Sequence, residues 1–169
     1  MDLPLWTSDG LLPPGPHAAD LSAIYERLVL DAPFRERREL LYAALAVHLR
    51  LMRELIPEGR AWIGGGFCVR KDQPPADVDV VILPAEWDDL RKIDIRGRMQ
   101  LHALLTLQDV AVRTPPIWFG RLQPVGGVLD AFICSPDREE YWHGAWSRVT
   151  DARGEVIDGL AKGYAEVTW

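Results

Sequence analysis

A run of mostly β-branched residues, DVDVVIL, occupies positions 77–83. It predicts a buried strand that begins with two acidic residues. Because side chains alternate between the faces of a strand, Asp77 and Asp79 project to one side while Val78 and Val80 face the other. Two such carboxylates repel each other, so in a partly buried place they need a cation or hydrogen-bond donors. Mg²⁺ suits this spacing because it prefers oxygen ligands, and two solvated acids at the surface are the plainer alternative.

Two helices are predicted ahead of this strand. Apolar residues recur at helical spacing between Asp20 and Asp31, which predicts a short first helix. The second helix has Asp31 as its cap and Pro33 in its first turn, and it ends before Pro57. Its apolar stripe consists of Leu41, Leu45, His48, Met52 and Leu55. We interpret His48 as a packed core histidine, because no second histidine or carboxylate lies at metal-ligand spacing.

The rest of the chain predicts short elements. Strands are expected at 61–69, interrupted by a glycine turn, and at 110–112, 128–134 and 164–167, the last at a sheet edge. Helices are expected in parts of 86–105, with a break near Gly97, and from a cap at Ser135 or Asp137 through Trp142. Residues 1–17, with four prolines, form an extended arm. The pattern predicts one α/β (α+β) domain over residues 1–169, with a small mixed β-sheet flanked by helices and two helices at its N-terminal end.

Composition limits the classes of function. The chain has 169 residues, of which 48% are hydrophobic, and this suits one domain core. A net charge of −6 without a Lys or Arg run argues against non-specific DNA binding. The densest basic segment, RERRE at residues 35–39, mixes both signs and predicts a solvated helix face. The seven tryptophans are interpreted as packing residues, because basic residues are not interleaved with them.

The cysteines and the N-terminal residues bear on location. Cys68 and Cys134 match no zinc or redox spacing, which predicts reduced thiols. Residues 1–10 lack the basic region and apolar stretch of a secretory signal. No apolar run approaches the roughly 20 residues needed to cross a bilayer. These features predict a cytoplasmic protein with no membrane partner.

A glycine triplet at residues 64–66 precedes the acidic pair. Glycines expose backbone N–H groups with no side chain to bar a phosphate. Neither G-x-x-x-x-G-K-[ST] nor G-x-G-x-x-G is present, so no P-loop or Rossmann site is expected. Asp130 lies among apolar residues of its strand, where an isolated carboxylate is unfavourable. A metal shared with Asp77 and Asp79 would supply the partner that Asp130 needs.

The order of these motifs resembles the nucleotidyltransferase superfamily, which includes DNA polymerase beta and the minimal bacterial nucleotidyltransferases. The resemblance rests on Gly65-Gly66-Phe67, a loop with Pro74 and Pro75, the acidic strand from Asp77, and Asp130 on a later strand. More narrowly, LPPG at 12–15, the arginine-rich second helix and KGY at 162–164 are similar to a bacterial and phage family of nucleotidyltransferase-like domains. This second resemblance covers almost the whole chain.

The resemblance implies a metal-dependent enzyme that moves a nucleoside monophosphate from a triphosphate such as ATP to a hydroxyl on a protein or an RNA. It implies that Asp77, Asp79 and Asp130 are both catalytic residues and ligands of Mg²⁺ or Mn²⁺. Asp130 would also receive the proton of the attacking hydroxyl. The implied nucleotide-binding residues are Gly65, Gly66 and Phe67, together with Arg70 and Lys71, which either reach the outer phosphates or remain solvated loop charges.

One departure from the superfamily supports an alternative. Gly66 stands where many members have serine, so a hydroxyl contact to phosphate is missing. The alternative is a nucleotide-binding or regulatory module without turnover, related to phage or toxin–antitoxin systems. A plain structural domain with surface acids is the third interpretation, and the buried setting of Asp130 argues against it.

Overall fold

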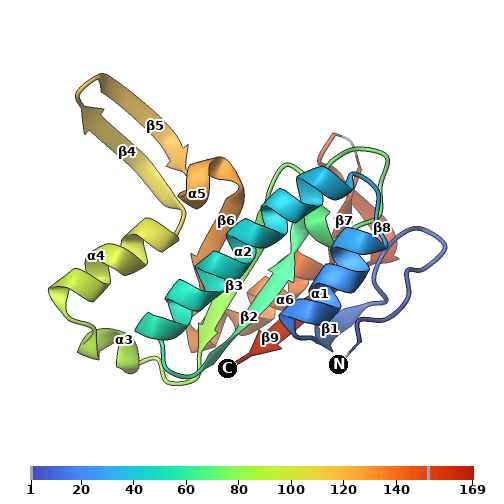
Figure 1. Ribbon diagram of the computed structural model, residues 1–169, viewed down its shortest axis with the longest axis horizontal. Helices are drawn as coiled ribbons and strands as arrows, with labels where there is room; N and C mark the ends of the chain where they lie inside the picture. The colour runs from blue at the N-terminus through green and yellow to red at the C-terminus, as the bar shows by residue number, and fades with distance from the viewer. Residues whose placement is uncertain (1, 152) are drawn as a thin grey trace.

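The computed structural model describes residues 2–151 and 153–169 and confirms the predicted mixed α/β class (Figure 1). Its main sheet has five strands in the order β1-β9-β2-β3-β6. Strand β2 is antiparallel to β3 and β9, whereas the β1–β9 and β3–β6 pairs are parallel. The strands span Gly15–Ala18 (β1), Gly59–Gly64 (β2), Val78–Pro84 (β3), Leu129–Ile133 (β6) and Gly163–Thr168 (β9).

Helices cover both faces of this sheet. The two predicted N-terminal helices lie on one face: α1 (Leu21–Ile24) continues into a π-helical turn (Tyr25–Leu30), and α2 spans Arg35–Leu55 (Figure 1). On the other face lies α6 (Glu139–Ser147), which follows a short 3₁₀ turn (Pro136–Arg138). The sheet therefore separates two layers of helix.

The predicted caps are only partly right. The Asp20 carboxylate accepts a hydrogen bond from the Ala23 N–H at 2.8 Å and caps α1. Helix α2 instead begins after Phe34, whose φ of 63° is left-handed, while Asp31 forms an ion pair with Arg27. Asp31 therefore belongs to the end of the first helical segment, and its predicted role as the cap of α2 is wrong.

The glycine triplet ends strand β2 more completely than predicted. At Gly65 the chain turns into a 3₁₀ helix (Gly65–Cys68), so Phe67 and Cys68 do not continue the strand. Val69 makes only an isolated bridge to Leu11. The turn depends on the left-handed φ of 67° at Gly65, a conformation that glycine adopts without strain.

The segment from residue 86 to 105 forms two helices, α3 (Asp89–Lys92) and α4 (Ile95–Leu104). The break lies at Ile93 and Asp94 rather than at Gly97. Its cause is a cap, because the Asp94 carboxylate accepts a hydrogen bond from the Gly97 N–H at 2.7 Å. The prediction of an interrupted helix is confirmed, and its position shifts by one turn.

Two hairpins lie outside the main sheet. The predicted strand at 110–112 extends to β4 (Leu107–Arg113) and pairs with an unpredicted strand, β5 (Pro116–Leu122). A short helix, α5 (Pro124–Gly127), leads from β5 into β6. The second hairpin joins β7 (Arg148–Thr150) and β8 (Val156–Ala161).

Strand β9 was predicted at a sheet edge, and this is wrong. It lies between β1 and β2, and its Tyr164 and Ala165 are fully buried. The N-terminal arm supplies the edge instead, because β1 pairs alongside β9 from Gly15 to Ala18. A pairing between the two ends of a chain leaves no local sequence pattern, and this explains the error.

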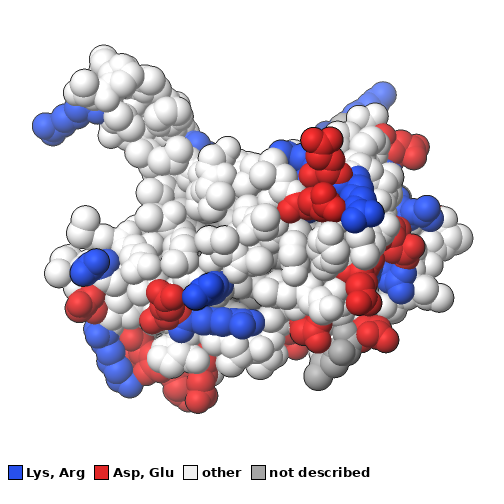
Figure 2. Space-filling view, in the orientation of Figure 1, with Lys and Arg blue, Asp and Glu red and all other residues white. Residues whose placement is uncertain are grey.

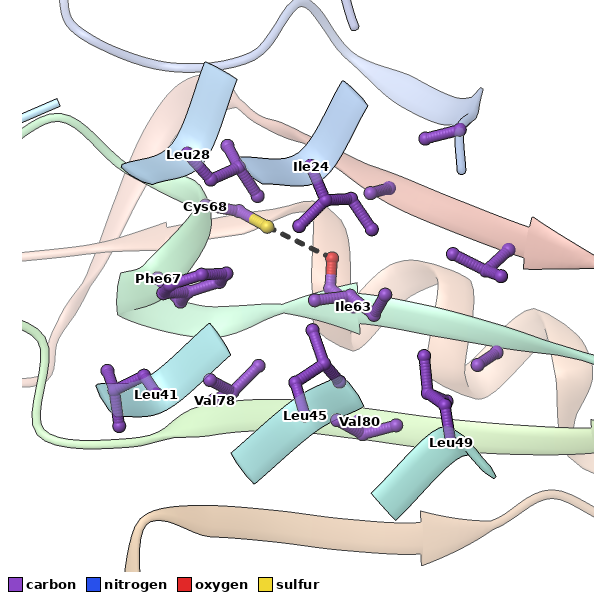
Figure 3. Close-up of a cluster of buried hydrophobic side chains, with 14 of the residues drawn as sticks. Ile24, Leu28, Leu41, Leu45, Leu49, Ile63, Phe67, Cys68, Val78 and Val80 are labelled. Carbon is purple, nitrogen blue, oxygen red and sulfur yellow. Dashed lines mark hydrogen bonds between the residues drawn. The ribbon is translucent and has the colours of Figure 1, made fainter. Parts of the chain in front are cut away.

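Apolar side chains form two cores, one on each face of the sheet. In the larger core, Leu41, Leu45 and Leu49 of α2 pack against Val78 and Val80 of β3 (Figure 3). The smaller core, under α6, contains Trp62, Val81, Leu83, Cys134, Trp146 and Tyr164, with Trp142 packed against it. Trp142 and Trp146 are therefore packing residues, as predicted.

Two polar side chains of α2 are fully buried. His48, a predicted core residue, donates through Nε2 to the Leu104 carbonyl at 2.9 Å. Burial lowers the pKa of His48. Arg38, predicted on a solvated helix face, is also fully buried, which corrects that prediction.

The Arg38 guanidinium bridges three segments. It donates to the carbonyl oxygens of Leu28 at 2.9 Å, Pro33 at 2.8 Å, Phe67 at 2.7 Å and Val69 at 2.7 Å. These four bonds tie the glycine turn and the loop after it to the N-terminal helices. Burial lowers the pKa of the guanidinium.

Among the described residues, no helix combines the length and apolar character needed to cross a membrane.

Candidate functional site

Three acidic side chains lie near the N-terminal ends of two neighbouring strands, β3 and β6. Asp79 of β3 and Asp130 of β6 are direct partners in the parallel pairing of these strands. Partners across a parallel pair have side chains on the same face of the sheet, here the α6 face. Asp77 lies two residues before Asp79 and projects toward the same side. The structure thus places the three predicted acids at the same end of the β3–β6 pair.

Asp130 is almost fully buried, with 5% of its surface exposed. Its Oδ1 accepts a hydrogen bond from the Thr106 hydroxyl at 2.7 Å, and its Oδ2 forms an ion pair with Arg121 of β5. Thr106 also accepts from the Ala131 N–H at 3.0 Å, which fixes the hydroxyl orientation. The sequence predicted a shared metal as the partner of this buried acid, whereas here its partners are a hydroxyl and a guanidinium.

Asp77 is also paired by the segment after β5. Its Oδ2 accepts a hydrogen bond from Gln123 Nε2 at 2.9 Å. In the part of the chain that the structure describes, no three His, Cys, Asp or Glu side chains are grouped as closely as metal ligands. In this conformation Asp130 and Asp77 are instead engaged by Arg121 and Gln123 of the hairpin segment.

Asp79 lies under the glycine turn. A Cβ on Gly65 would overlap Asp79 Oδ2, so only glycine fits above this carboxylate. Burial raises the pKa of Asp79, and the nearby Asp77 carboxylate raises it further. Lys162, Arg121 and Lys71 oppose this shift. Asp79 is a carboxylate whose charge its surroundings satisfy only in part.

Two lysines face this acid from different segments. A Cβ on Gly66 would lie 2.9 Å from Lys71 Nζ, so this lysine reaches back over the turn. Lys162, just before β9, lies with Nζ 3.5 Å from the Gly65 carbonyl oxygen. Burial lowers the pKa of Lys162, and the Asp79 carboxylate opposes that change. The glycine turn therefore lies over the Asp79 carboxylate and next to the ammonium groups of Lys71 and Lys162.

The other predicted nucleotide-binding residues lie differently. Phe67 is fully buried in the larger core, with the Arg38 guanidinium 5.6 Å from its ring centroid. Its buried side chain anchors the turn, so any contact of Phe67 with a nucleotide would have to come from its backbone. Arg70 lines a polar hollow of about 400 Å³ between its loop and the N-terminal arm. Lys71 lines the same hollow, and its ammonium group lies close to Gly66 of the turn.

A family profile described as a family of unknown function, DUF6932, matches residues 4–168. The chain belongs to this family. Neither a curated protein nor a solved structure matches it. The matched residues include the glycine turn, the three acids and Lys162, so the whole candidate site lies in the part of the chain that matches DUF6932.

A separate pocket of this DUF6932 chain lies at the opposite end of β3 and β6. It measures about 350 Å³, and its wall includes Gly59, Leu83, Cys134 and Trp169. Burial raises the pKa of the Cys134 thiol to about 11, so it is protonated near neutral pH. The predicted site residues do not line this pocket.

Sequence reasoning missed four polar residues that touch the acids or the turn. They are Thr106, Arg121, Gln123 and Lys162. Only Lys162 had a signal, since it belongs to the KGY segment at 162–164 that carried a family resemblance. The other three belong to or flank the β4–β5 hairpin. In the sequence, nothing distinguishes them from polar residues that are simply exposed to solvent.

Proposed function

We propose that this protein is a metal-dependent nucleotidyltransferase, which moves a nucleoside monophosphate from a triphosphate to a hydroxyl on a protein or an RNA. The observation that carries the proposal is the direct pairing of Asp79 with Asp130 on neighbouring strands, with Gly65 closed over Asp79. A pair of acids on one sheet face beside open backbone N–H groups suits a triphosphate with its divalent cation.

The acids fit Mg²⁺ or Mn²⁺ by their chemistry. Asp77 and Asp79 would hold the cation, with Asp130 as the third ligand, because all three offer hard carboxylate oxygens. The raised pKa of Asp79 supports this, since a carboxylate with unsatisfied charge gains most from a nearby cation. When bound, the metal would neutralise triphosphate charge as pyrophosphate leaves. Arg121 and Gln123 would have to release Asp130 and Asp77 first.

The residues around the acids would bind the phosphates. The N–H groups of Gly65 and Gly66 would bind phosphate oxygens, and Lys71 and Lys162 would neutralise the outer phosphates. The acceptor oxygen would form a bond to the α-phosphorus while the bond from that phosphorus to the bridging oxygen breaks. Pyrophosphate leaves with the electron pair, and Asp130 receives the hydroxyl proton.

The alternative is a nucleotide-binding or regulatory module without turnover, of phage or toxin–antitoxin type. Two observations favour it. Gly66 offers no hydroxyl to a phosphate, and Arg121 already neutralises Asp130. In this alternative the acids bind nucleotide and metal, but no bond to an acceptor forms.

One experiment separates the two functions. The full chain is incubated with each α-³²P-labelled triphosphate, Mg²⁺ or Mn²⁺, and a cell lysate, and both transferred label and nucleotide binding are measured. Asp77→Asn and Asp79→Asn should abolish transfer, whereas Asp88→Asn, at an exposed acid remote from the site, should not. Metal-dependent binding without transfer supports the module. Absence of both binding and transfer refutes the nucleotidyltransferase proposal.

A further inference from the structure

The β4–β5 hairpin stands apart from the body of the protein. It forms a two-stranded sheet of its own, and Figures 1 and 2 show it projecting beside the main sheet with open space around it. Each strand has one neighbour, so both outer edges carry unpaired backbone N–H and C=O groups. Isolated two-stranded hairpins are at best marginally stable in water, which favours a hairpin that another segment completes.

One face of the hairpin is an apolar strip that leads to the acids. Ile117, Phe119 and Arg121 alternate along β5 and share a face. Opposite them on β4, Val112 pairs with Ile117, and Val110 pairs with Phe119. We call Val110, Val112, Ile117 and Phe119 the hairpin strip. Arg121 continues this face to Asp130, so the strip and the acids are contiguous.

The charge of the hairpin bears on what binds it. Between residues 107 and 122 the sequence has two arginines, one aspartate and no lysine, and the whole chain carries a net charge of −6. The hairpin strip itself is uncharged, with Ile117 44% and Val112 38% exposed. Nucleic acids bind mainly through cations that neutralise phosphates, and this strip offers none. An apolar strip with free strand edges instead suits an extended protein segment.

We propose that the acceptor of this protein is an extended protein segment that pairs along an edge of the hairpin, places its apolar side chains beside those of the hairpin strip and presents a Ser, Thr or Tyr hydroxyl to Asp130. This inference rests on the proposed nucleotidyl transfer and names its acceptor class. The alternating pattern of a strand places every second side chain of the segment on the face of the hairpin strip, which is also the face of Arg121, so a hydroxyl in that same alternating series would face Asp130. Displacement of Arg121 from Asp130 would accompany docking.

The test measures docking directly. The probe is a fluorescein-labelled 12-residue peptide of alternating threonine and valine with a glutamate at each end, and its anisotropy is followed against the full chain. Ile117→Lys puts a charge in the strip and should weaken binding about tenfold or more. The matched control, Ala111→Lys, adds the same charge on the opposite face of the hairpin and should change binding less than about twofold. Equal losses in both variants, or no binding by the unmodified protein, overturn the inference.

Further readouts separate this inference from the proposed function. Metal-dependent binding of a fluorescent ATP analogue should be unchanged by Ile117→Lys and lost in Asp79→Asn. If the nucleotide does not bind while the peptide does, the proposed function fails and the acceptor role falls with it. If the nucleotide binds and a single-stranded RNA oligonucleotide binds the unmodified chain more tightly than the peptide does, a nucleic-acid acceptor replaces the protein one. A mass measurement showing a dimer that Ile117→Lys disrupts would assign the strip to a second copy.

Discussion

The carboxylate of Asp79 fills the space that a side chain on Gly65 would need. This contact joins the two sequence motifs that predicted a site, the glycine triplet and the acidic strand. The turn has a left-handed conformation at Gly65, with a φ of 67°, so two independent constraints require glycine at this position. The turn and the acid are therefore one structural unit.

Gly65→Ala should disturb both the fold and the site. The left-handed backbone and the overlap with Asp79 predict a loss of about 1 to 3 kcal/mol in the free energy of unfolding. Metal-dependent triphosphate binding should weaken at the same time. Chemical denaturation and nucleotide titration measure the two effects. Gly66→Ala is the matched control, because its Cβ would meet only the flexible end of Lys71, and equal destabilisation by both variants would contradict the account.

Asp79→Asn should stabilise the metal-free protein. The folded state raises the pKa of Asp79 above that of the unfolded chain. The unfolded state therefore releases this proton first, and the protein loses stability as the pH rises from about 4 through the folded pKa. The variant lacks this loss, so its Tm should exceed that of the unmodified chain at pH 7.5, with a smaller gap at pH 4.5.

Added Mg²⁺ should reverse the order of the two Tm values, so that the unmodified protein melts at a higher temperature than Asp79→Asn. A cation bound at Asp79 raises the Tm of the unmodified protein and leaves the Asn variant unchanged. Thermal denaturation with and without about 10 mM metal makes the comparison. This concentration is about a hundredfold above a Kd of roughly 0.1 mM. A Tm that is lower in Asp79→Asn than in the metal-free unmodified protein would show that the carboxylate is already satisfied by its neighbours.

Arg38→Met should be among the most destabilising changes in α2. It leaves four carbonyl oxygens, including those of Phe67 and Val69, without their donor, and we expect a loss of about 3 to 5 kcal/mol. Arg50→Met, at an exposed position of the same helix, should change stability by less than about 0.5 kcal/mol. Urea denaturation measures both variants, and similar values for the two would refute the structural role of Arg38.

The sequence predicted the elements whose pattern is local. The stripe that includes Leu41 and Leu45 identified α2, and the β-branched run after Asp77 identified β3, because burial on a known face dictates residue type at each step. The inner place of β9 and the existence of β5 were not predictable in this way. Both depend on which strands pair across long distances in the chain, and residue type does not encode that choice.

The residues of the candidate site also divide into those with a local sequence signal and those placed only by the fold. Asp77, Asp79 and Gly65 were predictable because an acid pair or a glycine triplet is unusual within a strand pattern. Arg121 was not, because a single basic residue in an exposed hairpin resembles any surface residue, and Lys162 was noticed only as part of the KGY segment and not as a neighbour of the acids. Their part in the site depends on how the fold places their segments beside the acids.

His48 should make stability depend on pH between about 5 and 7. Burial lowers its pKa below the unfolded value near 6.5, so the unfolded chain binds a proton that the folded chain does not. Stability is therefore full above pH 6.5 and falls as the pH decreases, by at most about 1.4 kcal/mol per pH unit. His48→Gln should flatten this slope in a Tm series, and an unchanged slope in the variant would contradict the assignment to His48.

Arg121 and a divalent cation compete for the same carboxylate. The guanidinium of Arg121 pairs with Asp130 from a half-exposed position, so its contribution to stability is about 1 kcal/mol or less. Arg121→Gln removes the competing charge, and we expect the affinity for Mn²⁺ alone to rise by about two- to tenfold. Titration calorimetry without nucleotide measures this change, and Arg113→Gln, at the exposed far end of the same hairpin, is the control. Weaker Mn²⁺ binding in Arg121→Gln would mean that the guanidinium orders Asp130 for the metal instead of excluding it.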